Sequence, residues 1–148
     1  MEIKYQDAEE KHIRGVCDLV NLMSPAAGDY RDAENRFVTL IKNNPSMRLW
    51  VALDGEQVVG TAMLHYQYKL SYHCGIAAHL EDVVVDPEYR KNKIGEALVN
   101  IAVDAAKQLG CYKIMLTCYE KTIPYYERLG FKKHDFGMRL SLKEEYPA

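Results

Sequence analysis

The sequence lacks several features that define whole classes of protein. Its 148 residues contain no hydrophobic run approaching the roughly 18–20 apolar residues that a membrane helix needs. The opening stretch, MEIKYQDAEEKH, is charged and has no apolar core, so we expect no secretory signal there. No repeat, linker or low-complexity tract interrupts the chain. We therefore expect a soluble, cytoplasmic protein with no membrane partner.

The chain also lacks paired cysteines and an excess of positive charge. Its four cysteines are scattered, without a CxxC pair or a His/Cys spacing typical of zinc sites: Cys17, Cys74, Cys111 and Cys118. We expect reduced, mostly buried thiols and no metal. The net charge of −2 argues against a general nucleic-acid binder, but it leaves room for a local anion site.

The composition fits one globular domain over residues 1–148. The chain is 48% hydrophobic, and a chain of about this length buries about 68–70% of the surface that its unfolded form exposes. Four segments carry apolar residues at helical spacing. They are residues 8–23, 32–43, 94–109 and 124–129, with Gly110 and Gly130 ending the last two.

The remaining patterns predict strands. Residues 1–6 alternate polar and apolar side chains, and residues 47–68 form two strands joined at Asp54 and Gly55. We expect a loop over 69–78, a strand over 79–85, and a buried central strand in CYKIMLTCY. A last strand or hairpin is expected over 131–142. This order predicts an α/β domain with a mixed sheet.

The stretch EDVVVDPEYRKNKIGEAL places a basic turn between a valine strand and a helix. The first turn of a helix presents unpaired N–H groups that bind phosphate. Arg90, Lys91 and Lys93 add positive charge, Gly95 permits close approach, and Asn92 tolerates a left-handed backbone. These features favour a pyrophosphate site. Taken alone, they fit a solvated loop of an ordinary strand–helix unit equally well.

Two motifs carry a resemblance that favours the pyrophosphate. The stretch just quoted resembles the acetyl-coenzyme A site of the GNAT acyltransferase superfamily, in which an R/Q-x-x-G-x-G/A turn opens a helix. PYYERLGF resembles the same family's aromatic-Tyr-x-x-x-Gly-Phe segment. HLEDVVVDPEYR, LGCYKIMLTC and YYERLGF are most similar to the glucosamine-6-phosphate N-acetyltransferases within it. The resemblance implies the GNAT fold, a mixed central sheet flanked by helices.

The resemblance also implies acetyl-coenzyme A (acetyl-CoA) as cofactor. The valine strand would pair with the pantetheine arm and offer amides to the oxyanion, and the turn amides would hold the pyrophosphate. The implied cofactor-binding residues are Val83, Val84, Val85, Arg90, Lys91, Asn92, Lys93, Ile94, Gly95, Glu96, Thr122 and Tyr126.

Two residues are candidates for catalysis. Glu81 lies two residues before Val83, so we expect it to share a strand face with Val83 and Val85. A carboxylate beside apolar surface has a raised pKa, which suits a general base acting directly or through water. By resemblance, Tyr126 protonates the departing thiolate. The alternative interpretations are a solvent-facing acid for Glu81 and a packed aromatic ring for Tyr126. His65, His79 and His134 have no partner visible in the sequence and are expected to be structural or surface residues.

The expected substrate is a primary amine of a small molecule, such as an aminosugar phosphate. The candidate substrate-binding residues are Lys69, Tyr72, His73, Glu81, Asp82, Thr117 and Arg139. The chain departs from the family pattern at Lys91 and Lys93, which replace glycines, and at Thr122, which replaces an asparagine. Thr117 replaces an acidic residue of the aminosugar enzymes, which weakens the case for that substrate and leaves other small amines open.

Other activities and assemblies also fit the sequence. The chain can be a protein or peptide N-acetyltransferase, or a non-catalytic sensor that binds acyl-coenzyme A. The enzymes that it resembles often pair through their C-terminal strands, so we expect a homodimer.

Overall fold

The computed structural model describes residues 1–26 and 28–144. The chain divides into two compact units, Met1–Leu116 and Thr117–Ala148, so the expected single domain over 1–148 stays a prediction. None of the helices in the described residues is both long enough and apolar enough to span a membrane.

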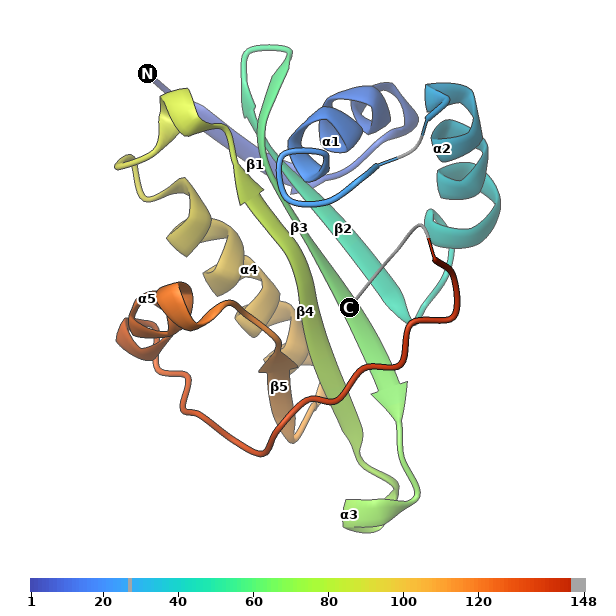
Figure 1. The fold of residues 1–148 in the computed structure, drawn as a ribbon, viewed down its shortest axis with the longest axis vertical. Helices are drawn as coiled ribbons and strands as arrows, with labels where there is room; N and C mark the ends of the chain where they lie inside the picture. The colour runs from blue at the N-terminus through green and yellow to red at the C-terminus, as the bar shows by residue number, and fades with distance from the viewer. Residues whose placement is uncertain (27, 145–148) are drawn as a thin grey trace. The chain divides into compact units, whose positions relative to one another are not determined.

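The first unit contains a five-stranded sheet whose strand order follows the chain (Figure 1). Its strands are β1 (Ile3–Asp7), β2 (Met47–Asp54), β3 (Gln57–Tyr68), β4 (Ile76–Val85) and β5 (Lys113–Leu116). The strands from β1 to β4 pair antiparallel, whereas β4 and β5 pair parallel. The predicted mixed sheet is therefore confirmed. The hairpin between β2 and β3 also forms as predicted, with Gly55 at a φ of 61°.

The α-helices are α1 (Ile13–Val20), α2 (Tyr30–Arg36), α3 (Ser71–Cys74), α4 (Ile94–Leu109) and α5 (Ile123–Arg128). Short helical turns cover Glu10–His12, Phe37–Ile41, Pro87–Tyr89 and Glu120–Thr122. Helix α4 has the predicted bounds and ends at Gly110, which adopts the left-handed conformation that favours glycine.

Two helices begin where local capping dictates rather than where the apolar pattern begins. Before α1, the backbone N–H of Glu9 donates to Nδ1 of His12 at 2.9 Å, which closes a separate turn. Helix α2 begins at Tyr30 because the Asp29 side chain accepts a hydrogen bond from the N–H of Arg31 at 2.8 Å.

Strand β4 begins at Ile76, so the predicted loop over 69–78 is shorter than expected.

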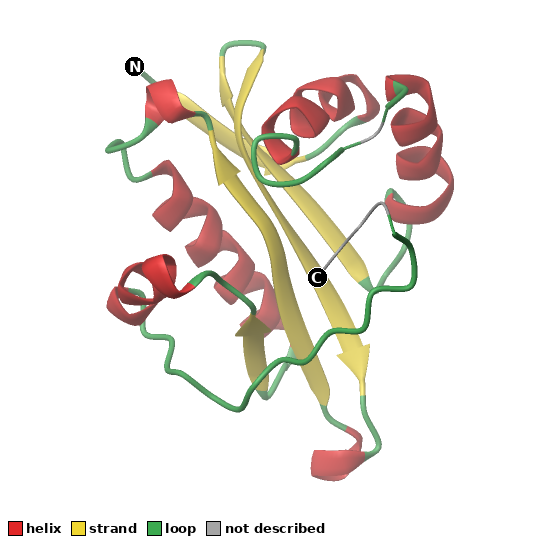
Figure 2. Cartoon of the chain, in the orientation of Figure 1, coloured by secondary structure: helices red, strands yellow, loops and turns green. Residues whose placement is uncertain are grey.

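Two strand predictions differ from the structure. The strand predicted in CYKIMLTCY forms as β5, but it lies at the edge of the described sheet instead of at its buried centre, and all four of its residues are only half-buried. Residues 131–142 form no strand, and Figure 2 draws them as loop. An apolar or alternating pattern indicates that a segment can pair, but the partner edge is set by residues far away in the chain.

Different helices cover the two faces of the sheet. On one face, Ile13 and Val16 of α1 pack with Leu49, Val51 and Leu53 of β2 in a buried cluster, and Met63 packs against it. On the other face, a Cβ added to Gly60 would lie 3.0 Å from Cγ2 of Ile94. Helix α4 therefore packs closely on the face that carries Gly60.

Candidate active site

Strand β4 is paired along both edges in its first half only. Residues 77–80 pair with β5, ending at Leu80 opposite Leu116. Residues 81–85 continue to pair with β3. Within residues 1–116, the other edge of 81–85 has no strand partner, so it is available to hydrogen-bond an extended ligand.

A bulge occurs where this open edge begins. Glu81 lies opposite Met63, but Val84 lies opposite Thr61, so Asp82 and Val83 together oppose one residue of β3. Asp82 adopts a φ of 52°, the left-handed conformation that accompanies one type of bulge.

The bulge corrects the predicted strand face. Thr61 and Met63 are two residues apart on β3, so Glu81 shares its face with Val84. Val85 lies opposite Gly60, on the face that α4 covers. The expectation that Glu81 shares a face with Val83 and Val85 is therefore wrong, because the extra residue reverses the alternation.

Two histidines flank the Glu81 carboxylate. Nε2 of His65 lies 3.7 Å from Oε2, and Nε2 of His79 lies 3.8 Å from Oε1. The Glu81 side chain is 46% exposed, whereas the two histidines are 32% and 25% exposed. Glu81 is therefore bordered by imidazoles rather than by the expected apolar surface, and a ligand can still reach its carboxylate. His65 and His79 also have a carboxylate partner that the sequence did not reveal.

Asp82 is a second acid beside this group. It is half-buried, and burial raises the pKa of its carboxyl group; the negative charge of Glu81 adds to the rise and His65 opposes it. Asp82 therefore lies close enough to Glu81 and His65 to respond to their charges.

The basic turn is anchored to the sheet before it reaches α4. The Asp86 carboxylate accepts from the N–H of Glu88 at 2.9 Å, and the Tyr89 hydroxyl donates to Oδ2 of Asp54 at 2.6 Å. The bond to Asp54 raises the pKa of the Tyr89 phenol. These contacts fix the turn next to the β2–β3 hairpin, so that residues 90–93 begin from a defined position.

Lysines occupy the left-handed positions of this turn. Lys91 and Lys93 adopt φ values of 71° and 59°, at the places where the sequence analysis expected glycine. Asn92, the residue expected to tolerate that conformation, does not adopt it; its side-chain amide donates to the backbone oxygen of Tyr89 at 3.0 Å. The lysine side chains are exposed to solvent and do not crowd the turn. The backbone can therefore adopt the same turn that glycine would allow.

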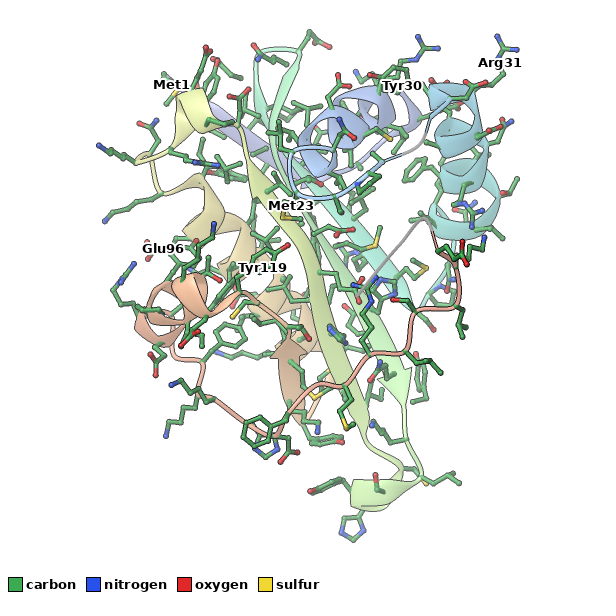
Figure 3. The ribbon with its side chains drawn as sticks, in the orientation of Figure 1. Met1, Met23, Tyr30, Arg31, Glu96 and Tyr119 are labelled. Carbon is green, nitrogen blue, oxygen red and sulfur yellow. The ribbon has the colours of Figure 1, made fainter. Side chains whose placement is uncertain are left out.

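The first turn of α4 leaves backbone donors available. Lys93 precedes the helix, and no side chain caps its N-terminus. The N–H groups of Ile94, Gly95 and Glu96 have no acceptor within a helix that begins there. Figure 3 shows Glu96 on this first turn. The donors and the positive end of the helix dipole favour an anion such as a pyrophosphate.

Tyr126 lies on α5, in the second unit. Its ring meets Tyr125 and Phe131 edge to face, at centroid distances of 5.1 and 5.8 Å. Burial raises the pKa of Tyr126 to about 12, with smaller contributions from Tyr125 and Cys118. The phenol therefore keeps its proton throughout the physiological range and is able to donate a hydrogen bond. Thr122 directly precedes α5 and donates its hydroxyl to the Tyr119 backbone oxygen at 2.8 Å.

These elements, in this order, match a known family. The acetyltransferase (GNAT) family matches residues 16–131. The chain belongs to the GNAT acetyltransferase family. Its residues 81–96 thus combine an open strand edge, a left-handed turn and an uncapped helix start within a GNAT domain.

Individual GNAT proteins are similar over most of the fold. A glucosamine 6-phosphate N-acetyltransferase of Trypanosoma brucei brucei is 43% identical over 86 residues, which are 58% of each chain. An acetyltransferase crystal structure from Trypanosoma brucei has a TM-score of 0.87 at 30% identity, covering 95% of this chain and 100% of that one. A glucosamine-6-phosphate N-acetyltransferase structure from Arabidopsis thaliana reaches 0.89 at 24% identity, covering 97% and 100%, and shows the shared fold.

The chain spans about half the length of the first curated relatives that it matches. The matched part is 58% of the Trypanosoma brucei brucei protein and 55% of the one from Arabidopsis thaliana.

Three of the predicted substrate-binding residues do not lie near Glu81 in this GNAT domain. Lys69, Tyr72 and His73 belong to the connection between β3 and β4, at the end of the hairpin opposite Val85 (Figure 1). Glu81 lies five residue steps after Ile76 along the strand, which corresponds to about 17 Å. Tyr72 instead stacks on Tyr112 at a centroid distance of 4.5 Å.

The remaining predictions concern two substrate-binding residues of the second unit, the cysteines and metal ions. Thr117 and Arg139 belong to the second unit, and both are exposed. None of the four cysteines is fully buried, and Cys74 is exposed, so the prediction of mostly buried thiols is wrong. In the described part of the chain, no group of three or more His, Cys, Asp or Glu side chains is arranged to hold a metal ion.

Proposed function

We propose that this GNAT chain transfers an acetyl group from acetyl-CoA to a primary amine of a small molecule. The observation that carries the proposal is the continuity of residues 81–96, which join an exposed carboxylate, an open strand edge and unpaired helix N–H groups. An extended thioester arm needs the strand edge, and a pyrophosphate needs the helix start. The strand edge and the helix start follow each other along the chain, as the thioester arm and the pyrophosphate follow each other along the cofactor.

The reaction needs two proton transfers and the stabilisation of one negative charge. Glu81 takes a proton from the amine, directly or through a water molecule, and the amine nitrogen attacks the thioester carbon. Backbone N–H groups among Val83, Val84 and Val85 stabilise the oxyanion. The carbon–sulfur bond then breaks, and Tyr126 gives its proton to the thiolate. With a pKa of about 12, Tyr126 begins fully protonated.

We propose an aminosugar phosphate, such as glucosamine 6-phosphate, as the substrate. The support is the name of the Trypanosoma brucei brucei relative, which is 43% identical to the chain over 86 residues. The neutral Thr117 in place of an acid opposes this choice, because a carboxylate near the site attracts an ammonium group. Other small primary amines remain the competing substrates.

A free-thiol assay tests both levels of the proposal. The chain is incubated with acetyl-CoA and an amine from a panel that includes glucosamine 6-phosphate, polyamines, aminoalkylphosphonates and peptides. We expect rapid thiol release with one small amine. Tyr126→Phe should slow thiol release by about 10- to 100-fold while acetyl-CoA binding survives. Thiol release only with peptides would instead identify a protein or peptide N-acetyltransferase.

The non-catalytic sensor is a second candidate from a different class. Lysines in place of the turn glycines would fit such a sensor if they disturbed the turn. Because Lys91 and Lys93 adopt left-handed backbone conformations, this substitution no longer argues against a working cofactor site. Calorimetry separates the two functions: tight acetyl-CoA binding without turnover on any amine would favour the sensor.

We also propose a cytoplasmic homodimer that pairs through the C-terminal segment, residues 131–142. Phe136, Met138, Leu140 and Leu142 are between 84% and 98% exposed. They alternate along the chain, so an extended segment would present them on one face, which needs a partner. The free cysteines are compatible with the cytoplasm. Sedimentation equilibrium should give a dimer, and Leu140→Lys should give a monomer whereas Lys133→Ala should not.

A further inference from the structure

The proposed chemistry requires the Glu81 carboxylate but not the two imidazoles of His65 and His79 beside it. Each oxygen of the carboxylate faces a different imidazole, at 3.7 and 3.8 Å, and the two imidazoles come from neighbouring strands. His65 and His79 lie directly opposite each other in the pairing of β3 with β4. At these distances neither imidazole is hydrogen-bonded to the carboxylate, but the two rings border it on both sides and so limit where it can point.

The two imidazoles also determine the charge around Glu81. A histidine side chain changes charge between about pH 5 and pH 8. A neutral imidazole leaves the carboxylate free to accept a proton. A charged imidazolium stabilises the carboxylate as an anion, weakens it as a base and repels a cationic amine.

Other charged groups on this face are weaker candidates for the same effect. On β4, Asp82 is half-buried and carries the same sign of charge as Glu81. On β5, the ammonium group of Lys113 lies over the Tyr112 ring, 5.5 Å from its centroid. Helix α4 lies on the opposite face of the sheet.

Helix α1, which packs on the Glu81 face, has titratable groups that are engaged elsewhere. Arg14 pairs with Glu34 at 2.6 Å, and Asp18 accepts a hydrogen bond from the Tyr30 hydroxyl. Cys17 and Met63 both pack against the buried apolar cluster of α1 and β2. Among the described side chains of these elements, the basic groups nearest the Glu81 carboxylate are therefore the two imidazoles.

We infer that His65 and His79 are positioning residues that aim the Glu81 carboxylate and make its action as a base depend on their own charge. This inference rests on the proposed acetyl transfer, in which Glu81 accepts the proton of the amine. A positive charge on either imidazole would suppress the base, whereas uncharged imidazoles border the carboxylate without weakening it. At water-like screening, each positive charge about 4 Å away changes the proton affinity of a carboxylate by about fivefold.

The test compares pH profiles of acetyl transfer in the full chain. The variants are His65→Gln, His79→Gln and both together, and kcat/KM is measured with acetyl-CoA and the best amine of the panel. The double variant should be about tenfold slower than the original chain at about pH 8, because the carboxylate is no longer aimed. This deficit should shrink to about twofold or less at about pH 6, because acid favours the imidazolium form, which opposes the base, and the glutamines of the variant carry no charge. Dividing the two profiles cancels the protonation of the amine itself.

The matched control is His134→Gln, which removes a histidine that also pairs with an acid, Asp135, at 3.2 Å. Its ratio to the original chain should stay near one at every pH. In a Glu81→Gln background, replacing the two histidines should leave the pH profile unchanged, because they act through Glu81. Circular dichroism melting checks that each variant is folded.

The outcomes separate this inference from the function on which it rests. A ratio that is constant between about pH 6 and about pH 8, in folded variants of an active chain, overturns the inference and leaves acetyl transfer standing. If the histidine variants alter the profile equally with and without Glu81, the positioning role is also wrong. Absence of transfer to any amine by the original chain overturns the proposed function itself, and the inference with it.

Discussion

The two halves of strand β4 have opposite surroundings. Residues 77–80 pair on both edges and include three residues with 2% exposure or less, Ala77, Ala78 and Leu80. Residues 81–85 pair on one edge, contain a bulge and begin with an exposed carboxylate. The first half has its backbone donors committed to neighbouring strands. The second half keeps one edge available, so the same strand holds the sheet together and presents a binding edge.

Substitutions in the two halves should therefore affect different properties of the protein. A change in the doubly paired half disturbs packing, so it should appear in stability. A change in the open half meets solvent or ligand, so it should appear in binding and turnover. Substitutions in the two halves should therefore differ in which of these quantities they alter.

The largest effect is expected from Glu81→Gln. It keeps the shape of the side chain but removes the base, and general base catalysis contributes about 10²- to 10⁴-fold. We expect kcat to fall within that range and the melting temperature to change little, because the side chain is 46% exposed. Steady-state kinetics and thermal melting measure the two quantities. A fall in kcat of less than about threefold would remove Glu81 from the chemistry.

Ala78→Leu should give the opposite result. Ala78 is fully buried and lies opposite Tyr66, on the sheet face that α4 covers. A larger side chain there overpacks the core, so we expect the free energy of unfolding to fall by about 1–3 kcal/mol. Urea denaturation measures this loss. The folded variant should keep kcat within about twofold of the original chain; a larger loss would mean that the paired half also shapes the site.

Local signals in the sequence were sufficient for the helix and the turn. Helix α4 has both a regular apolar stripe and a terminal glycine, so its bounds were predicted from Ile94 to Leu109. The basic turn also lies between the valine strand and α4, as its short motif indicated, whereas the role of Glu81 stays a prediction. These features depend on neighbours within a few residues.

Features that depend on pairing between distant segments were missed. The bulge at Asp82 reverses the faces of the strand, yet nothing in the alternation of residues 79–85 indicates it. His79 was within reach of prediction, since it lies two residues before Glu81, but His65 joins them only through the register of β3. The edge position of β5 likewise follows from strand order, which local sequence does not determine.

A smaller effect is expected at the turn beyond the open half. Lys93 adopts a left-handed conformation immediately before α4, and this costs a non-glycine residue about 1–2 kcal/mol. Lys93→Gly should therefore raise the free energy of unfolding by about 1 kcal/mol. Lys93→Ala removes the same charge without relieving the backbone, so it serves as the control and should not stabilise. Equal stability of the two variants in urea denaturation would show that the conformation carries no cost.

The smallest effect is expected from Asp82→Asn at the bulge, and it should depend on pH. Folding raises the pKa of the Asp82 carboxyl group, chiefly by burial, so the folded state binds its proton more tightly than the unfolded state. The stability that this contributes is complete below the unfolded pKa of about 3.9 and is lost as the pH rises through the higher folded pKa. The asparagine of the variant carries no titratable proton, so the stability of the variant does not fall in this way as the pH rises. The melting temperature of the variant minus that of the original chain should therefore be more positive at about pH 7 than at about pH 3.5. Asp104→Asn, at an exposed position on α4, corrects for the general effect of losing one negative charge. A corrected difference that stays constant with pH would mean that Asp82 is as well solvated in the folded bulge as in the unfolded chain, and that this part of the strand is open on both sides.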